Sequence, residues 1–299
     1  MESRKAVFAV IGAGILWGVI SLFIRPLSAA GLDPMQIASV RMVTASVLFL
    51  CVIAVRSPGK LRVRVRDLWM FAGTGIVSVS LFNFCYFYTI IHSEASVAVV
   101  LLYTSPVFIL LLSAILFRER ITRRKVFALL LTFAGCVCVA GLTGGVRLSA
   151  VVFLTGIGSG LFYGLYTIFG RYALAKYDAV TVTAYSFLFA LAGSLPFGRP
   201  DALVRTIAAE PPLLLLCAGI GLCSTVLPYY LYTWGLERME SGKAAILVAV
   251  EPLVGAVVGM LIFHESRSAV KLIGIALILT AIVLLNLPDK AKETISQTE

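Results

Sequence analysis

The sequence predicts an all-α membrane protein of ten transmembrane helices, arranged as two inverted five-helix repeats around a central cavity. Three observations lead to this fold class. The 299 residues are 60% hydrophobic and only 13% charged, a balance that does not suit a water-exposed surface. Long apolar stretches follow one another along nearly the whole chain, and the second half matches the first half in register.

The apolar stretches have the length that a membrane requires. A helix needs roughly 17 to 25 apolar residues to cross a hydrocarbon core of about 30 Å. Seven stretches contain no charged residue and no histidine, and three more are nearly as apolar. The ten predicted spans are residues 6–24, 34–55, 68–91, 95–117, 126–146, 148–170, 179–198, 211–236, 244–263 and 272–287.

The basic residues between the spans predict the orientation. If the N-terminus is cytoplasmic, 18 lysines and arginines lie in cytoplasmic segments and 6 lie on the opposite side. This bias agrees with the positive-inside rule, which predicts a multi-pass protein of the cytoplasmic membrane with both termini in the cytoplasm. It also accounts for the net charge of +10, so no nucleic-acid partner is expected.

The chain repeats itself at an offset of 146 residues without a gap. The predicted repeats are residues 1–146 and 147–299. Each repeat has five spans, an odd number, so the second enters the membrane from the opposite side. Such halves commonly form a site near the bilayer midplane and expose it alternately, whereas a duplication kept only for packing is the alternative. The matches include Gly14, Gly18, Tyr86, Pro106 and Lys125 with Gly160, Gly164, Tyr232, Pro252 and Lys271.

Two local elements accompany the repeat. The first span of each half is rich in glycine, and the fourth contains a proline and closes in an aromatic-x-Glu element. These elements read Ser105-Pro106 to Phe117-Arg118-Glu119 and Glu251-Pro252 to Phe263-His264-Glu265. Together with the duplicated five-span unit, they resemble the drug/metabolite transporter superfamily, specifically its ten-helix type with two EamA-like halves. The resemblance implies transport but leaves the cargo open among amino acids, other metabolites, nucleotide-linked sugars and drugs.

Polar side chains within the spans predict the lining of the cavity, because a polar group in hydrocarbon is costly unless it faces protein or water. The fifth and tenth spans have almost none and are expected to be peripheral. In the alternative interpretation, Tyr and Trp mark the membrane interfaces and Ser and Thr bond their own helices. The candidates are Trp17, Ser21, Arg41, Asn83, Tyr86, Tyr103, Ser105, Tyr163, Thr167, Tyr185, Tyr229 and Tyr232.

Two charged residues and two prolines stand out among the spans. Glu251 lies about 12 Å into the membrane, where a carboxyl group can exchange a proton as its access alternates. It can instead pair with a substrate ammonium or with Arg41, or serve a structural role in its protonated form. Arg41 can bind a substrate carboxylate or extend its side chain to lipid phosphate. Pro106 and Pro252 are predicted hinges, since proline removes a helix hydrogen bond.

Other function classes lack the residues that they need. The six cysteines all fall within predicted spans and are interpreted as packing residues, so no metal and no cofactor is expected. Both histidines lie at span ends and no catalytic pair is visible, which argues against an enzyme. The predicted function is secondary active export of small metabolites, amino-acid-like or drug-like, across the cytoplasmic membrane. The predicted partners are a small-molecule substrate, membrane lipid and, as a further candidate, a proton. The alternatives are a nucleotide-sugar or lipid-linked carrier of the same fold, and a membrane scaffold without transport.

Overall fold

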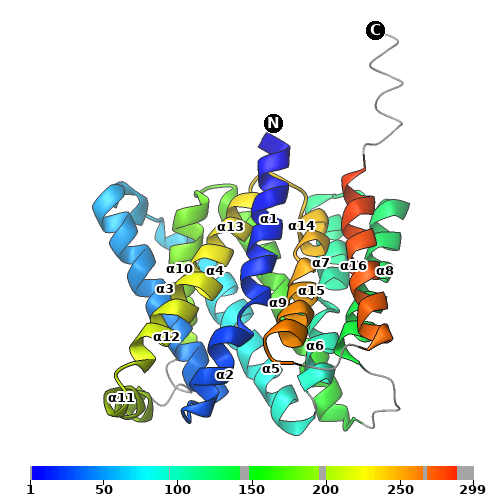
Figure 1. The fold of residues 1–299 in the computed structure, drawn as a ribbon. Coiled ribbons are helices and arrows are strands. Elements are labelled where there is room, and N and C mark those ends of the chain that lie inside the picture. The colour runs from blue at the N-terminus through cyan, green and yellow to red at the C-terminus, as the bar shows by residue number, and fades with distance from the viewer. Residues whose placement is uncertain (1, 94, 142–147, 195–199, 265–267, 288–299) are drawn as a thin grey trace.

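In the computed structural model, most helices run up and down along one common axis, whereas α11 (Pro200–Ala209) lies across it (Figure 1). The structure describes residues 2–93, 95–141, 148–194, 200–264 and 268–287, and these contain no strand. Helix α1 (Glu2–Gly18) begins and helix α16 (Ala269–Asn286) ends at the same end of the bundle, here called the upper end. The opposite end is called the lower end.

The first half of the chain crosses the bundle several times. After α1 come α2 (Ser21–Ala29), α3 (Pro34–Arg56), the short turns η1 (Pro58–Leu61) and η2 (Val65–Asp67), α4 (Leu68–Ala72), the π-helix η3 (Gly73–Ser80), α5 (Leu81–His92), α6 (Ala95–Leu102), α7 (Ser105–Phe117) and α8 (Arg123–Ala140). Helices α4, η3 and α5 follow one another directly and form one continuous column.

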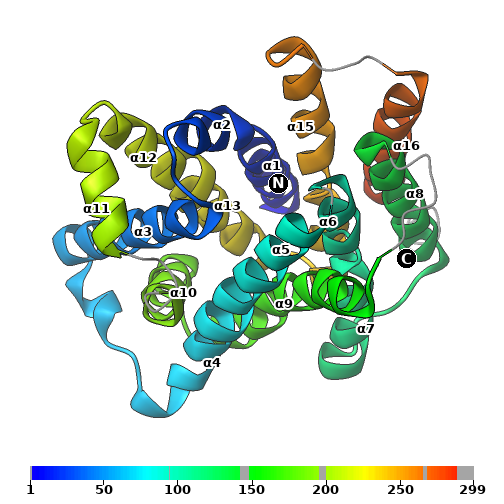
Figure 2. The ribbon, with the colours of Figure 1, turned by 90° about the horizontal axis from the view of Figure 1, so that it is seen from below.

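The second half repeats this order with small changes. It consists of α9 (Ala150–Leu174), α10 (Ala179–Ser194), α11 (Pro200–Ala209), α12 (Leu213–Gly221), the π-helix η4 (Leu222–Val226), α13 (Leu227–Leu236), α14 (Ser241–Leu247), α15 (Val250–Leu261) and α16. Seen along the axis, α1 and α9 lie inside the bundle, while α8 and α16 pack together at one edge (Figure 2).

Local sequence signals begin several of these helices. The carboxylate of Asp33 accepts from Gln36 N at 2.9 Å, and the Gln36 side chain accepts from Asp33 N, which forms a capping box before α3. Thr122 caps α8 and Ser268 caps α16 in the same way, each accepting from a backbone N–H three residues later. The positions of these two caps differ by the 146 residues of the sequence repeat, so the same signal starts the last helix of each half.

Within the described part of the chain, eight helices are long and apolar enough to cross a membrane, against ten in the sequence prediction: Arg4–Ala29, Pro34–Val55, Val65–His92, Val97–Phe117, Ala150–Leu174, Leu213–Leu236, Ser241–Leu261 and Ala269–Asn286. The two remaining predicted spans correspond to α8, which opens with Arg123, Arg124 and Lys125, and to α10, which has 16 residues. The ten-span count is therefore not confirmed by length and composition. Residues 146 and 147, at the predicted boundary of the repeats, lie outside the described residues.

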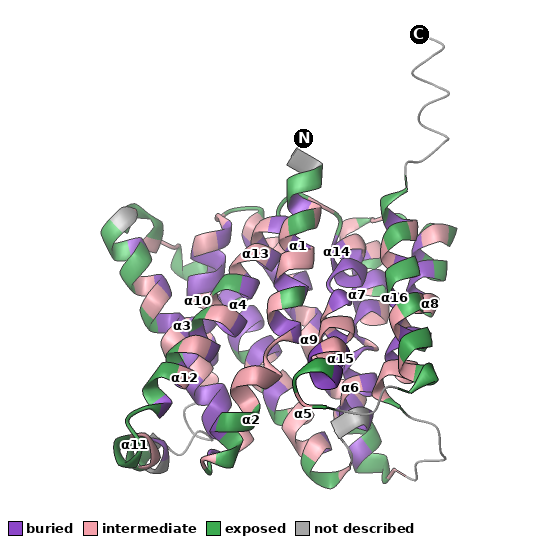
Figure 3. Ribbon diagram, viewed as in Figure 1, coloured by how far each residue is buried: buried purple, intermediate pink, exposed green. Residues whose placement is uncertain are grey.

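Exposed residues are frequent on outer helices such as α16 (Figure 3), and many of the exposed residues are large and apolar, as a lipid-facing protein requires. Ile115 is 74% exposed and Leu215 is 80% exposed. Polar groups are instead found inside, where Thr74, Ser78, Ser159 and Ser186 are fully buried. Many of these hydroxyls bond a carbonyl of their own helix, as that of Ser159 does with Gly156 O at 2.6 Å, so they need no water.

Glycines join the two halves through closely similar contacts. A Cβ atom on Gly14 would lie 2.8 Å from Val248 O, and one on Gly18 would lie 2.7 Å from Glu251 O. In the other half, a Cβ on Gly160 would lie 2.9 Å from Leu101 O, and one on Gly164 would lie 3.3 Å from Ser105 O. The first long helix of each half thus packs against the interrupted fourth column of the other half.

The helix interruptions are also related by the repeat, with one exception. A turn at Tyr103–Thr104 divides α6 from α7, and a turn at Val248–Ala249 divides α14 from α15. When the halves are aligned at the 146-residue offset, the two turns differ in position by one residue. The π-helices η3 and η4 correspond as well. The exception is the turn at Val19–Ile20 between α1 and α2, because the equivalent residues lie inside the unbroken α9.

Candidate functional site

A cavity of about 280 Å³ lies between α1, α2, α3, α5, α9 and α13. Its lining includes residues from both halves and extends from Trp17 in the middle of the bundle to Ser28 and Pro34 at the lower end. Most of the lining is apolar or aromatic, with a few polar groups among it, as is usual for a small-molecule site. We call it the central cavity. The polar groups include Arg41, Asn83 and Glu251, the hydroxyls of Tyr86, Tyr163 and Tyr229, and Ser28 at the lower end.

Arg41 enters the central cavity from α3 and is held on one side by η4. Its Nε donates to Thr225 Oγ1 at 3.0 Å, and its Nη2 donates to Ser224 O at 3.5 Å. Thr225 is 184 residues from Arg41 in the sequence and Ser224 is 183 residues from it, and both are fully buried. The guanidinium therefore faces protein and cavity, and does not reach outward to lipid phosphate.

Glu251 is the second residue of α15 and enters from the opposite side of the central cavity. It shares the lining of a second cavity with Tyr103, which is buried at the turn between α6 and α7. Glu251 and Arg41 come from different halves of the chain, so the two halves bring a carboxyl group and a guanidinium group to one cavity.

Glu251 also lines a second cavity of about 450 Å³. This second cavity lies between α1, α2, α6, α8, α15 and α16 and shares Trp17, Ile20, Tyr86 and Leu102 with the central cavity. Toward the lower end it is lined by Arg25, whose guanidinium lies 3.8 Å from the centre of the Phe263 ring, and by Lys271. The fifth and tenth predicted spans, α8 and α16, contribute no residue to the central cavity, but they do reach this second cavity. Helix α8 contributes Val139 and Ala140, and α16 contributes Lys271.

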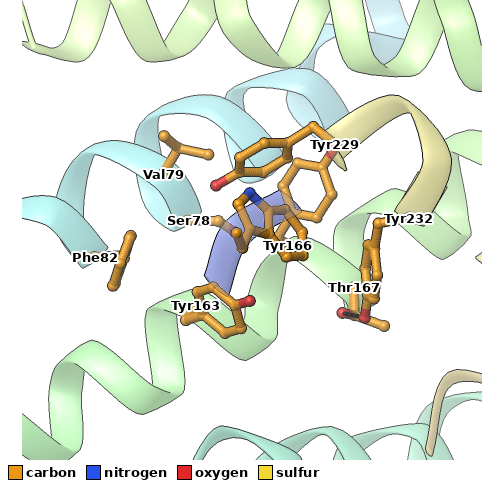
Figure 4. Close-up of a pocket in the computed structure, with 9 residues that line it drawn as sticks. Ser78, Val79, Phe82, Tyr163, Tyr166, Thr167, Tyr229 and Tyr232 are labelled. Carbon is orange, nitrogen blue, oxygen red and sulfur yellow. Dashed lines mark hydrogen bonds between the residues drawn. The ribbon is translucent and has the colours of Figure 1, made fainter. Parts of the chain in front are cut away.

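Aromatic rings close the central cavity toward the upper end (Figure 4). The ring of Tyr229 lies 5.0 Å from that of Trp17, 5.2 Å from that of Tyr166 and 4.9 Å from that of Phe187, measured between centroids. Beside them the hydroxyls of Thr167 and Tyr232 are 2.7 Å apart, and those of Tyr166 and Thr233 are 2.9 Å apart. Only about 10 Å³ of space remains among these side chains, so nothing larger than water fits.

Polar contacts hold the upper end together above this aromatic cluster. The carboxylate of Glu119 accepts from Ser241 N at 2.8 Å and from Gly242 N at 3.2 Å, so it caps α14 from the other half. Glu265, which ends the equivalent aromatic-x-Glu element of the second half, lies outside the described residues. Further contacts join Lys125 with Glu240 at 2.5 Å, Lys60 with Asp178 at 2.8 Å, Lys176 with Asp67 at 2.6 Å, and Arg171 with Leu236 O and Met239 O at 2.8 and 2.6 Å.

The predicted site residues fall into three places. Those lining the central or second cavity are Trp17, Ser21, Arg41, Asn83, Tyr86, Tyr103, Tyr163, Tyr229 and Glu251. Thr167 and Tyr232 belong to the closed aromatic region above it. Tyr185 and Ser105 are not among the residues that line either cavity. Tyr185 donates to Leu61 O at 2.6 Å near the upper end, because a tyrosine hydroxyl close to a span end finds a loop carbonyl. Ser105 is 2% exposed and its carbonyl faces Gly164.

The two predicted hinge prolines stand at the starts of helices. Pro106 is the second residue of α7 and Pro252 is the third residue of α15, directly after the two turns described above. In the first turn of a helix a proline leaves no extra carbonyl unpaired, because its missing N–H would have had no intrahelical partner. Among the described residues, no group of three or more His, Cys, Asp or Glu could hold a metal ion.

Comparison with known proteins connects this geometry with transport. The model of the EamA-like transporter family matches the chain twice, at residues 4–141 and 150–287. An uncharacterized transporter of Archaeoglobus fulgidus is 28% identical and covers 90% of this chain and 94% of its own. A probable terminal-alkyne amino-acid exporter of Streptantibioticus cattleyicolor is 27% identical, with 96% and 95% of the two chains covered. A solved protein structure with 18% identity has a TM-score of 0.77 over 95% of this chain and 96% of its own, which shows the fold alone.

Proposed function

Since the chain belongs to the EamA-like transporter family and is a multi-pass membrane protein, we propose that it is a secondary active transporter of small zwitterionic metabolites resembling amino acids. The single observation that supports this cargo is the presence of Arg41 and Glu251 in one cavity of about 280 Å³. A guanidinium binds a carboxylate in bidentate fashion, and a carboxylate binds an ammonium. The apolar and aromatic wall between them suits an aliphatic or aromatic side chain, or a drug-like cation.

We propose ten spans in two inverted repeats, with α8 and α10 counted among them. The support is the double match to the family model, whose two segments begin 146 residues apart, as in the sequence repeat. Paired helix interruptions and paired glycine contacts at the same offset add to it. Helix α8 packs along α16, and its basic residues all lie in its first turn, so the apolar remainder can lie within the membrane.

Alternating access is the proposed mechanism. The upper end is held closed by the polar contacts of Glu119, Lys125 and Arg171, whereas both cavities extend to the lower end. At the 146-residue offset, the partners of Lys125 and Arg171 are Lys271 and Arg25, which line the second cavity at the lower end. In the opposite state these two cations would close the lower end while the upper contacts open.

Proton coupling and export complete the proposal. Glu251 is the coupling group, because it lines both cavities and would release its proton when a substrate ammonium or Arg41 takes the proton's place. Both termini are placed in the cytoplasm on the bias of basic residues, so the structure corresponds to a state open to the outside. The relative named as an amino-acid exporter supports export as the direction.

A second candidate cargo is favoured by one observation. Arg25 and Lys271 add two cations to the 450 Å³ second cavity, and nucleotide-linked sugars or lipid-linked anions need several cations for their phosphates. Such a carrier of the same fold would use the second cavity as part of its binding site. The zwitterion is preferred because the central cavity has one cation and one anion.

The test is binding followed by transport with purified protein. A thermal-shift screen compares amino acids, nucleotide-linked sugars and cationic drugs, and counterflow of the stabilising compound is then measured in proteoliposomes. We expect amino acids to stabilise the protein and radiolabelled L-leucine to be exchanged. Stabilisation by nucleotide-linked sugars alone would replace the proposed cargo with the second candidate, and counterflow of none of the compounds would exclude transport of these classes.

A further inference from the structure

The Arg41 side chain has one hydroxyl group, that of Thr225, among its two hydrogen-bond acceptors. Thr225 is fully buried in η4, and its Oγ1 donates to Ile220 O at 3.1 Å. A hydroxyl has one hydrogen and two lone pairs, so this bond uses its only hydrogen. Toward Arg41 the Thr225 oxygen therefore acts as an acceptor, and the 3.0 Å contact is donated by Nε of Arg41.

The guanidinium group divides into a held edge and a free edge. Its Nε–H and one N–H of Nη2 point the same way in the plane of the group, and both are directed at η4. Among the residues that the structure describes, none accepts a hydrogen bond from Nη1. Because the group is rigid and planar, holding the first edge fixes the direction of the edge formed by Nη1 and the second N–H of Nη2.

We propose that Thr225 is a positioning residue that turns the free edge of Arg41 into the central cavity, where it receives the cargo carboxylate in bidentate fashion. The proposal rests on the proposed function, since it assigns an orientation to the group that binds the carboxylate. A side chain as long as arginine has many rotamers, and a fixed one loses less entropy when the ligand binds. The cargo is thereby bound in one direction, with its carboxylate toward α3 and its ammonium toward α15.

The first half of the chain provides an internal comparison for this role. The residues equivalent to Thr225 and Arg41 are Val79 and Phe187, which are 2% and 0% exposed and belong to one apolar cluster. The π-helix η3 forms with Val79 at this position, and there the hydroxyl of Ser78 donates to Gly73 O at 2.9 Å. A hydroxyl at the Thr225 position is therefore not needed to build the π-helix. It occurs in the half in which an arginine has to be held.

Thr225 lies in the π-helix η4. A π-helix is a rare local widening of an α-helix and is often found at functional sites, since it displaces side chains relative to the regular turn. The carbonyl of Ser224, next to Thr225, accepts from Nη2, so two successive residues of η4 contact the same guanidinium. The sequence offers no sign of this arrangement, because Thr225 looks like any hydroxyl within an apolar span.

The test compares Thr225→Val with Thr225→Ser in the full-length purified protein. Valine has nearly the same shape as threonine but offers no acceptor, whereas serine keeps the hydroxyl. Binding is measured with L-leucine and with L-leucinamide, which lacks the carboxylate. We expect Thr225→Val to weaken L-leucine binding about tenfold, the effect of one hydrogen bond to a charged group, and to leave L-leucinamide binding nearly unchanged. Thr225→Ser should restore L-leucine binding.

A second measurement is independent of any cargo. In protein labelled with ¹⁵N-arginine, the Nε–H resonance that disappears in Arg41→Lys is assigned to Arg41. We expect this resonance to be retained in Thr225→Ser and to shift or broaden in Thr225→Val. An unchanged resonance in Thr225→Val, or equal weakening of L-leucine and L-leucinamide, would overturn the positioning role. If the unaltered protein binds neither probe, the proposed amino-acid cargo fails, and the resonance alone decides the role of Thr225.

Discussion

The two halves of this protein share a framework and differ at the site. Equivalent glycines, helix caps and helix interruptions occur at an offset of 146 residues, yet the residues that meet in the cavity are unlike. The residue equivalent to Arg41 is Phe187, and the residue equivalent to Glu251 is Ser105. The interrupted pair α1 and α2 corresponds to the unbroken helix α9. Each half therefore supplies one charged residue, and the equivalent position in the other half is uncharged, so a ligand between the two charges is bound in one direction.

The comparison of Glu251 with Ser105 gives the largest expected effect. Glu251→Gln keeps the shape of the side chain and removes the exchangeable proton, so we expect it to abolish the component of transport that a pH gradient drives in proteoliposomes. Ser105→Ala, at the equivalent buried position, should retain that component. Proton-driven transport by Glu251→Gln at the normal rate would remove this residue as the coupling group.

The two cations at equivalent helix starts should act at opposite ends of the molecule. Lys125 is 8% exposed at its side chain and joins Glu240 at 2.5 Å, next to the start of α14. Lys125→Gln should raise amide hydrogen exchange in α14 about tenfold, because a charge-assisted contact is lost at the upper end. Lys271→Gln is the control and should leave α14 unchanged. Equal exchange in both variants would contradict the assignment of Lys125 to upper-end closure.

The glycine contacts between the halves can be tested one by one. A Cβ atom on Gly14 would lie 2.8 Å from Val248 O, whereas one on Gly255 would meet only Gly18 O at 3.6 Å. Gly14→Ala should therefore destabilise the protein by about 1 to 3 kcal/mol, as overpacking does, and lower its melting temperature in detergent. Gly255→Ala should melt within about a degree of the unaltered protein, since the added methyl group has space.

The smallest effect is expected for Lys60 and Asp178, which join the halves at the surface of the upper end. Their side chains are 44% and 38% exposed, so Lys60→Gln should cost less than about 1 kcal/mol of unfolding free energy. The hydrogen bond to Asp178 raises the pKa of Lys60 above its ordinary value. The contribution of this ion pair to the unfolding free energy is complete at a pH below the ordinary pKa of lysine. It is lost as the pH rises through the raised pKa of Lys60. A pH-independent difference between Lys60→Gln and the unaltered protein up to strongly alkaline pH would contradict this.

The sequence predicted the membrane-spanning class and most of the polar residues that line the central cavity for a simple reason. Apolar length and isolated polar residues within spans are direct consequences of a hydrocarbon solvent, so Arg41, Glu251 and Trp17 stand out without any tertiary information. The offset of 146 residues is likewise visible as matching letters.

Tertiary contacts decide what the sequence could not predict. Thr225 orients Arg41 from 184 residues away, and nothing distinguishes it in the sequence from other hydroxyls. Tyr185 has the same residue type and spacing as the cavity tyrosines, but its helix begins near the upper end and its hydroxyl finds Leu61 O. The turn at Val19–Ile20 was not foreseen either, because neither residue disfavours a helix.

The most direct test of the account measures which end of a zwitterion each charge recognises. Binding of L-leucine, L-leucinamide and 4-methylpentanoate is compared in Arg41→Gln and Glu251→Gln. L-leucinamide lacks the carboxylate, and 4-methylpentanoate lacks the ammonium group. We predict that Arg41→Gln no longer prefers L-leucine to L-leucinamide but still prefers L-leucine to 4-methylpentanoate. Glu251→Gln should still prefer L-leucine to L-leucinamide but no longer prefer it to 4-methylpentanoate. Equal weakening of all three compounds by both variants, or no weakening by either, would contradict a central site built from one charge of each half.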